Sequence, residues 1–218
     1  MFAGSAICSH GARRIVNGDV VLTYSMSSLV ERILLQAHSK GTKFRTILVD
    51  ARPKLEGKVM LRRLVRAGLE CSYVLLPALG YVMTQVSKVL LGAHSMLANG
   101  VTVARVGTAM VGAMACENNV PVLVCCETYK FSDVVQVDSF NSNELGDPDE
   151  LIATGRDDAK FAGDSLQEWR DISTLKLLNL TYDVMPSNFV RMVLTDSGEI
   201  PPTAIPVIIR EYHDKDSL

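Results

Sequence analysis

The chain lacks most of the features that would assign it quickly to a functional class. Its 218 residues include 22 Lys plus Arg and 24 Asp plus Glu, so the net charge of -2 gives no reason to expect nucleic-acid binding. The longest apolar runs, such as Val120–Cys126, are too short to cross a bilayer. Five cysteines and four scattered histidines include no Cys-x-x-Cys pair, so we expect no metal site.

Standard catalytic and nucleotide-binding motifs are missing as well. The sequence contains no G-x-G-x-x-G, no G-x-x-x-x-G-K-[ST] and no G-x-S-x-G, and nothing pairs a nucleophile with an evident base. We therefore expect no cofactor. The odd number of cysteines, two of them adjacent at Cys125 and Cys126, is typical of reduced thiols. No cation precedes the short apolar start of the chain, so we expect a cytoplasmic protein without a secretory signal.

Short β-rich runs alternate with longer helical patterns along the chain. Helices are predicted over Ser27–Ser39, Glu56–Ala67 and Leu79–Gln85, within Asn99–Asn118, and from Ser187 or Asn188 to Thr195. Strands are predicted over Asp19–Tyr24, Phe44–Asp50, Cys71–Leu76, Lys88–Gly92, Val120–Cys125, Leu177–Tyr182 and Ile205–Arg210. This alternation predicts a doubly wound, Rossmann-like α/β domain with a mainly parallel sheet of six or seven strands.

Charge is unevenly distributed along the sequence. Residues 1–70 hold twelve Lys or Arg and five Asp or Glu, whereas residues 133–171 hold eleven Asp or Glu and three Lys or Arg. The acidic part interrupts the α/β pattern as a loop at about residues 138–165, which is either a solvated excursion or a partner-binding edge. The basic segment Lys54–Arg66 is likewise either a solvated helix face or a surface for an acidic partner.

Polar residues follow several predicted strands, where ligands bind in open α/β sheets. Ser25, Ser27 and Ser28 could cradle a phosphate or simply cap the next helix. Arg52 could clamp an anion or pair with a nearby carboxylate, and His94 could be a ligand or a structural histidine. Cys125 and Cys126 are most simply packed thiols.

Several long strings together resemble a known family. They include VLTYSMSSLVERIL, FRTILVDARPKLEGKVMLRRLVRAGLECSYVLLPA, VSKVLLGAHSMLANGVTVARVGTAM and LLNLTYDVMPSNFVRMVLTDSGEIPPTAIPVIIRE. The chain resembles the regulatory subunits of eukaryotic translation initiation factor 2B over Val16–Glu211. VPVLVCCETYKF and SNEL point to the delta branch of that family. Residues 1–15 do not match, so the expected organisation is an unmatched segment followed by a Rossmann-like C-terminal domain over residues 16–218.

The resemblance implies a non-catalytic regulatory role in translation initiation. Alpha, beta and delta subunits regulate a guanine-nucleotide exchange factor whose exchange chemistry lies in the gamma and epsilon subunits. The expected partners are the beta subunit, paired directly with this chain, the other three subunits, and initiation factor 2. The regulatory part binds the alpha subunit of initiation factor 2 and senses its phosphorylation. No membrane or direct nucleic-acid partner is expected.

Sugar-phosphate isomerases, including methylthioribose-1-phosphate isomerase, share the fold that the resemblance implies. Their catalytic cysteine corresponds to Ser25 here and their catalytic aspartate to His94. An Asn-Lys pair that contacts substrate corresponds to Ala104-Arg105, whereas Arg52 matches. The alternatives to a regulatory subunit are therefore an isomerase-like enzyme that uses other residues, or a vestigial pocket that binds a sugar phosphate or nucleotide. Its candidate residues are Ser25, Ser27, Ser28, Arg52, His94, Asn99 and Arg105.

Two further groups of residues are candidates for contact with partners. The resemblance places Phe140, Leu178 and Leu180 near a delta–beta junction, although all three could be ordinary core residues. Asn143, Glu144 and Asp147 are candidate contacts in the acidic loop.

Overall fold

The computed structural model describes residues 2–136, 143–152 and 166–216. A seven-stranded sheet with the order β11-β10-β7-β4-β1-β2-β3 forms its centre, and only β11 runs antiparallel to its neighbour. The strands are β1 (Val20–Tyr24), β2 (Arg45–Asp50), β3 (Glu70–Leu75), β4 (Lys88–Gly92), β7 (Val122–Cys125), β10 (Met192–Thr195) and β11 (Gly198–Ile200). This confirms the predicted doubly wound, mainly parallel architecture.

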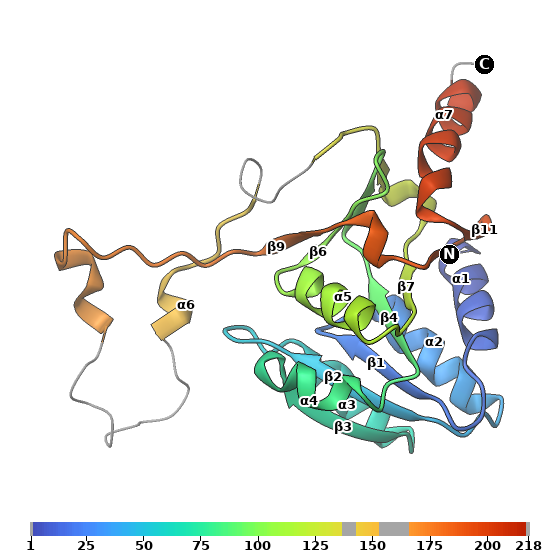
Figure 1. Ribbon diagram of the computed structural model, residues 1–218, viewed down its shortest axis with the longest axis horizontal. Helices are drawn as coiled ribbons and strands as arrows, with labels where there is room; N and C mark the ends of the chain where they lie inside the picture. Colours follow the sequence, from blue (N-terminus) through green and yellow to red (C-terminus); the bar gives the residue numbers. More distant parts are fainter. Residues whose placement is uncertain (1, 137–142, 153–165, 217–218) are drawn as a thin grey trace.

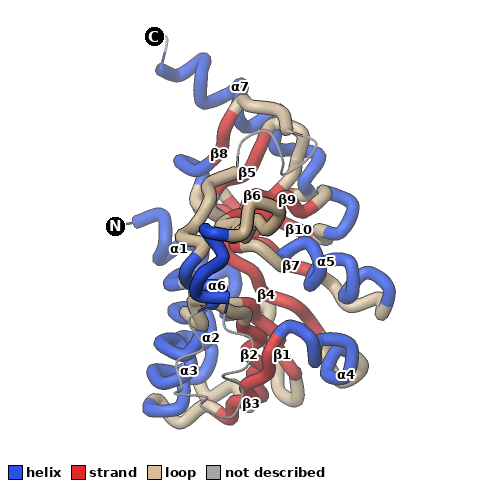
Figure 2. The backbone as a smooth tube through the Cα atoms, turned by 90° about the vertical axis from the view of Figure 1, so that its left-hand side faces the viewer, coloured by secondary structure: helices blue, strands red, loops and turns tan. Residues whose placement is uncertain are grey.

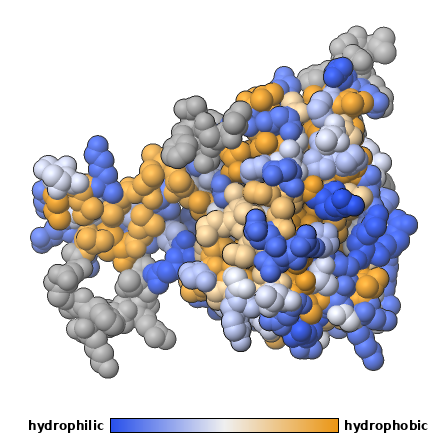
Figure 3. All heavy atoms as spheres, in the orientation of Figure 1, coloured by the Kyte–Doolittle hydropathy of each residue, from blue (hydrophilic) through white to orange (hydrophobic). Residues whose placement is uncertain are grey.

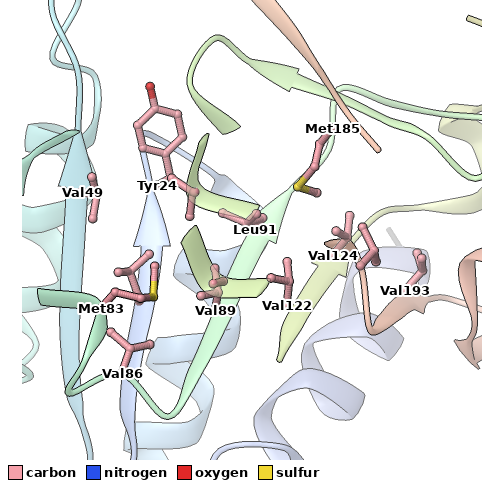
Figure 4. Close-up of a cluster of buried hydrophobic side chains, with 14 of the residues drawn as sticks. Tyr24, Val49, Met83, Val86, Val89, Leu91, Val122, Val124, Met185 and Val193 are labelled. Carbon is pink, nitrogen blue, oxygen red and sulfur yellow. The ribbon is translucent and has the colours of Figure 1, made fainter. Parts of the chain in front are cut away.

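Helices cover both faces of this sheet (Figures 1 and 2). One layer contains α1 (Phe2–Arg13), α2 (Ser28–Ser39) and α3 (Gly57–Arg66), and the other contains α4 (Leu79–Met83) and α5 (Thr108–Glu117). Because β1, β4 and β7 are buried on both faces, they appear in the sequence as continuous apolar runs. Figure 4 shows one of the two cores, in which Leu91 and Val124 of the sheet lie near Met185.

A second, four-stranded sheet with the order β8-β5-β6-β9 lies beside the first. Its strands are β5 (Ser95–Leu97), β6 (Thr102–Arg105), β8 (Phe131–Ser132) and β9 (Tyr182–Met185). The sequence pattern did not predict this sheet, because its strands are only two to four residues long and pair with distant segments. Met96 and Met185 of these strands are fully buried against the α5 side of the main sheet.

Three predicted elements in the C-terminal part of the chain were wrong. Ile205–Arg210, predicted as a strand, begins helix α7 (Ile205–Asp216), and its buried residues Ile205 and Ile209 are one helical turn apart. The predicted helix that ends at Thr195 is a short 3-10 turn, Ser187–Phe189, followed by β10, which completes the main sheet beside β7. Within the predicted strand Leu177–Tyr182, Leu180 forms only an isolated bridge, and β9 begins at Tyr182.

Two ion pairs connect the end of α1 and the loop after it to the main sheet. Lys88 Nζ lies 2.6 Å from Asp19 Oδ2 and 2.6 Å from the carbonyl oxygen of Arg14, so the start of β4 is tied to the α1–β1 loop. Arg14 also pairs with Glu199 of β11. Among the described helices, none is both long and apolar enough to cross a membrane.

Candidate functional site

A cavity of about 250 Å³ lies over the carboxyl ends of β1 and β4. These neighbouring strands lead to opposite sides of the sheet, since the chain continues from β1 to β2 but β4 pairs next with β7. Such a switch in strand order is where open α/β sheets usually bind ligands. The candidate residues Ser25, Ser27, Ser28, His94 and Arg105 all line this cavity, together with Thr108, Lys130 and Tyr182.

The serines combine a capping role with a position at the cavity. Ser27 is the N-cap of α2, and its Oγ accepts a hydrogen bond from the backbone N–H of Val30 at 3.3 Å. Ser25 is buried, has a positive φ of 55°, and donates its backbone N–H to the carbonyl oxygen of Val49 at 2.8 Å. The N-terminus of α2 therefore opens on the cavity with its positive dipole end.

Close packing at the floor of the cavity requires a glycine. A Cβ added at Gly92, the last residue of β4, would overlap Ser27 Oγ and lie 2.9 Å from Ser27 Cβ. The end of β4 can therefore approach the first turn of α2 because residue 92 has no side chain.

The cations at the cavity are already paired with carboxylates. Arg105 lies 2.5 Å from Glu56, and Lys130 lies 2.9 Å from Glu127. Burial opposes the charge of Lys130, but its contact with Glu127 outweighs that effect and raises the lysine pKa. An incoming anion would have to compete with both carboxylates for these cations.

His94 faces a ring rather than a reacting group. Its imidazole is exposed and lies over Tyr182, with 4.4 Å between the ring centroids. Tyr182 comes from β9, about ninety residues away in the sequence. The stacking is a structural role for His94 that leaves its exposed edge at the cavity.

Arg52 lies at a neighbouring cavity. With Lys54 and Glu56 it lines a smaller cavity that shares Tyr24, Ser25 and Arg105 with the first one. Arg105, which lines both cavities, pairs with Glu56 of the smaller one.

Asn99 is not brought to either described cavity. It lies exposed in the turn between β5 and β6, where its amide donates to the carbonyl oxygen of Gln136 at 2.9 Å. The sequence pattern predicted a helix-containing segment from Asn99 onward, whereas Asn99 lies in the turn of the β5–β6 hairpin. Asn99 is therefore the one candidate pocket residue that lines neither of these two cavities.

The described thiols near the cavity are poor nucleophiles. Burial raises the pKa of Cys126 to about 12 and raises that of Cys125 even further above the usual thiol range. The complete burial of Cys125 and Cys126 is consistent with the prediction that both are packed thiols. In the described residues, no group of three His, Cys, Asp or Glu side chains could hold a metal ion.

Asp183 fills a second position where an anion could bind. Its carboxylate accepts hydrogen bonds from the backbone N–H groups of Gly107 at 3.1 Å and Ala109 at 3.0 Å, at the start of α5. Gly107 has a φ of 98°, which favours glycine. No sequence signal connected Asp183 with this helix. Lys130, by contrast, belongs to the polar string after the predicted strand Val120–Cys125 and could have been included from its position.

An arm built from residues 143–152 and 166–181 projects from the two sheets (Figure 1). Its two segments are joined by backbone hydrogen bonds. Gly146 N–H donates to the carbonyl oxygen of Asn179, and Thr181 N–H donates to the carbonyl oxygen of Glu144. The Asn143 side chain bonds both backbone polar groups of Tyr182, at 2.7 and 3.0 Å. The arm also contains the short helix α6 (Asp149–Ile152), and Asp147 Oδ1 accepts a hydrogen bond from Asp149 N.

The arm exposes apolar side chains, as Figure 3 shows. Leu145 is 67% exposed and Leu178 is 61% exposed, whereas Leu180 is half-buried and pairs with Leu145. Leu178 is thus not an ordinary core residue within this chain. Phe140 and much of the acidic loop lie outside the described residues.

Known proteins with similar sequences place this architecture in a family. A model described as "Initiation factor 2 subunit family" matches residues 2–202. The chain belongs to the initiation factor 2 subunit family. The match includes residues 2–15, so the prediction that residues 1–15 lie outside the family was wrong. In the structure this segment is largely α1, which buries Ile7 and Cys8 against α2 and the main sheet.

Curated members of the family include two delta subunits. The chain is 47% identical over 96% of its length to "Translation initiation factor eIF2B subunit delta" of Dictyostelium discoideum, and 42% identical over 97% to the protein of that name from Schizosaccharomyces pombe. It spans 34% and 45% of those proteins. It is also 30% identical, over 92% of its length and 59% of the relative, to "Ribose 1,5-bisphosphate isomerase" of Pyrococcus furiosus.

Solved structures agree with the assignment to this family. The translation initiation factor eIF-2B of Pyrococcus horikoshii superposes with a TM-score of 0.75 at 26% identity, over 92% of this chain and 65% of that one. A chain of the tetrameric eIF2B-beta2-delta2 complex from C. thermophilum superposes with a TM-score of 0.73 at 29% identity. The match covers 89% of this chain and 55% of that one.

Proposed function

We propose that this chain acts as a delta-type, non-catalytic regulatory subunit in translation initiation. The observation that carries the proposal is the 47% identity to a delta subunit over 96% of the chain, well above the 30% identity to an isomerase. In this role it is a cytoplasmic subunit of the guanine-nucleotide exchange factor for initiation factor 2. The gamma and epsilon subunits perform the exchange, and the regulatory subunits respond to phosphorylation of the alpha subunit of initiation factor 2.

The chemistry of the cavity supports a non-catalytic role. Ser25 stands where the resemblance places the catalytic cysteine of the isomerases, and His94 stands where it places the aspartate. A serine hydroxyl needs a neighbouring base to become a nucleophile, and no hydrogen bond links the Ser25 side chain to a base among the described residues. The nearby thiol of Cys125 is held protonated by burial.

The arm supports a role in assembly. An extended arm with exposed leucines is unfavourable in a free monomer, and burying such side chains against a partner stabilises a complex. Pairing with a beta subunit, as in the beta–delta tetramer whose structure resembles this chain, is the contact we assign to Leu178 and Leu180. Phe140 remains a candidate for the same contact, and the acidic residues Glu144 and Asp147 remain candidates for its rim.

The test is the light-scattering mass of the chain alone and mixed with a beta subunit from the same source. A defined heteromer is expected, and Leu178→Asp should weaken it because that side chain is 61% exposed in the isolated chain. Val16→Asp, at a residue that is 57% exposed but distant from the arm in the sequence, is the matched control. No heteromer, or equal weakening by both variants, would contradict the proposal.

A second candidate function is binding or isomerisation of a sugar phosphate. The observations that favour it are the cavity at the β1–β4 switch point and the similarity to ribose 1,5-bisphosphate isomerase. Ribose 1,5-bisphosphate should be incubated with the purified chain, and both turnover and thermal stability should be measured. Turnover that disappears in Ser25→Ala or His94→Ala would establish the enzyme. A thermal shift without turnover would indicate a retained binding pocket in a regulatory subunit.

A further inference from the structure

Helix α3 presents an exposed face rich in positive charge. Lys58, Arg62 and Arg66 follow one another at a spacing of four residues, and Lys54 precedes them in the turn before the helix. With a rise of 1.5 Å per residue, the helical cations are spaced roughly 6 Å apart along one side. We call Lys54, Lys58, Arg62, Arg66 and the two exposed valines Val59 and Val65 the α3 face.

The four cations of the α3 face have no carboxylate partner within the described part of the chain. The neighbouring Arg63 pairs with Glu31 at 3.1 Å, and Glu56 pairs with Arg105. From Arg52 to Arg66 the sequence contains six cations and only one carboxylate, Glu56. The charge of this face is therefore not balanced locally.

Helix stability does not explain the placement of these charges. Like charges four residues apart repel, as Lys58 with Arg62 and Arg62 with Arg66 do here. The helix dipole favours Arg66 in the last turn but disfavours Lys58 in the first turn, where no acidic residue is present. The one carboxylate near Lys58, that of the N-cap residue Glu56, pairs with Arg105 instead of with a cation of the α3 face.

The α3 face also contains apolar surface. Val59 is 47% exposed and Val65 is 54% exposed, and helical geometry places these two valines on either side of the row of cations. Phosphate groups of a nucleic acid would use the cations but gain little from valines, whereas a protein segment can use both. The net charge of -2 also gives no long-range attraction for nucleic acid.

We propose that the α3 face is a docking surface for an acidic protein segment that carries carboxylates at helical spacing and apolar residues beside them. Helix α3 lies on the same side of the sheet as α1 and α2 (Figure 2). The cavity lies at the carboxyl ends of β1 and β4. It is also formed by residues other than those of the arm. The surface is thus an additional contact, distinct from the pairing assigned to the arm.

The test measures binding of three fluorescent probes to the chain by anisotropy. The first is an amphipathic peptide with glutamate at every fourth position and leucines beside the glutamates, the second is polyglutamate of equal charge, and the third is a single-stranded RNA of equal charge. Lys58→Glu/Arg62→Glu should weaken binding of the amphipathic peptide about tenfold or more, because two attractions become repulsions. Lys176→Glu/Arg191→Glu, a change of equal charge at exposed residues outside α3, is the control and should change it less than twofold.

Val59→Ser/Val65→Ser separates the apolar from the electrostatic contribution. This variant should weaken binding of the amphipathic peptide several-fold and leave binding of polyglutamate unchanged. Lys58→Glu should keep or raise the melting temperature, because it removes a cation from the positive end of α3. The proposal is overturned by equal losses in the two charge-reversal variants, by failure of the peptide to bind, or by tighter binding of RNA that is indifferent to the valine changes. A melting temperature lowered by Lys58→Glu would also overturn it, because the cation would then be structural.

Discussion

Replacing Lys88 by methionine removes the cation that connects the start of β4 to the α1–β1 loop. Lys88 Nζ contacts Asp19 Oδ2 and the Arg14 carbonyl oxygen, each at 2.6 Å. The side chains of Lys88 and Asp19 are only 15% and 8% exposed. Methionine keeps the apolar stem of the lysine but leaves the carboxylate of Asp19 without its counter-ion.

The expected loss of stability is large for one substitution. Removing one partner of a buried ion pair costs about 3–5 kcal/mol, and the residual exposure of Lys88 favours the lower end. For a chain of this size, about 3 kcal/mol corresponds to a decrease in melting temperature of roughly 9 °C. The backbone N–H of Val16 and the hydroxyl of Ser87 still donate to Asp19, at 2.7 and 2.8 Å, and keep the loss from being greater.

The loss should depend on pH with a definite sign. Burial alone would raise the pKa of Asp19, but the hydrogen bonds from Lys88, Val16 and Ser87 lower it below its ordinary value. The stabilisation is therefore complete above the unfolded-state pKa of about 4 and is lost as the pH falls through the lower folded-state pKa. Without Lys88, burial dominates and favours the protonated acid, so the variant loses stability as the pH rises.

Thermal and urea unfolding of both proteins at pH 7 and pH 4 provides the assay. The stability difference between wild type and Lys88→Met should be largest at pH 7 and should shrink at pH 4. Asp19→Asn/Lys88→Met, which leaves no unpaired charge, should recover part of the loss. A difference below about 1 kcal/mol, or one that is equal at both pH values, would refute the reasoning, since the pair would then behave as an exposed one.

Three further predictions concern the arm, the cavity and the thiols. Leu180→Asp should weaken assembly with a beta subunit, measured by light scattering, more than it lowers the melting temperature; outright unfolding of the isolated chain would identify Leu180 as core. Gly92→Ala should destabilise the fold by about 1–3 kcal/mol in urea unfolding, because the new Cβ overlaps Ser27 Oγ, and unchanged stability would mean that β4 and α2 can separate freely. At pH 8 a thiol reagent should modify the exposed Cys116 in the native protein but leave Cys126, whose pKa burial raises to about 12, unmodified until denaturant is added; equal rates would contradict its burial.

Local sequence patterns predicted the part of the fold that is built from long, regular elements. The apolar runs of β1, β2, β4 and β7 and the amphipathic period of α2 and α3 were sufficient because each element is buried on a definite side. The position of the cavity followed from the same alternation, because ligand sites lie beyond the carboxyl ends of parallel strands. This is why five of the seven candidate pocket residues line one cavity.

Short segments with distant partners could not be assigned in this way. Apolar residues alone do not distinguish a strand from one turn of a buried helix, so Ile205–Arg210 was predicted as a strand although it begins α7. Met192–Thr195 becomes a strand because it pairs with β7, nearly seventy residues earlier in the sequence. The β5–β6 hairpin around Asn99 was not predicted for the same reason, since it pairs with β8 and β9 from distant parts of the sequence.

The sequence by itself determined the doubly wound class, the main helices and strands, the candidate cavity and the family resemblance, because these depend on periodic burial and on recognisable strings. Only the tertiary structure decided that Arg105 and Lys130 are already paired, that Asp183 caps α5, that His94 stacks on Tyr182 and that Leu178 is exposed on an arm. The physical reason is that burial, ion pairing and capping depend on which distant segments lie together in space. The long-range packing of the folded chain determines that proximity.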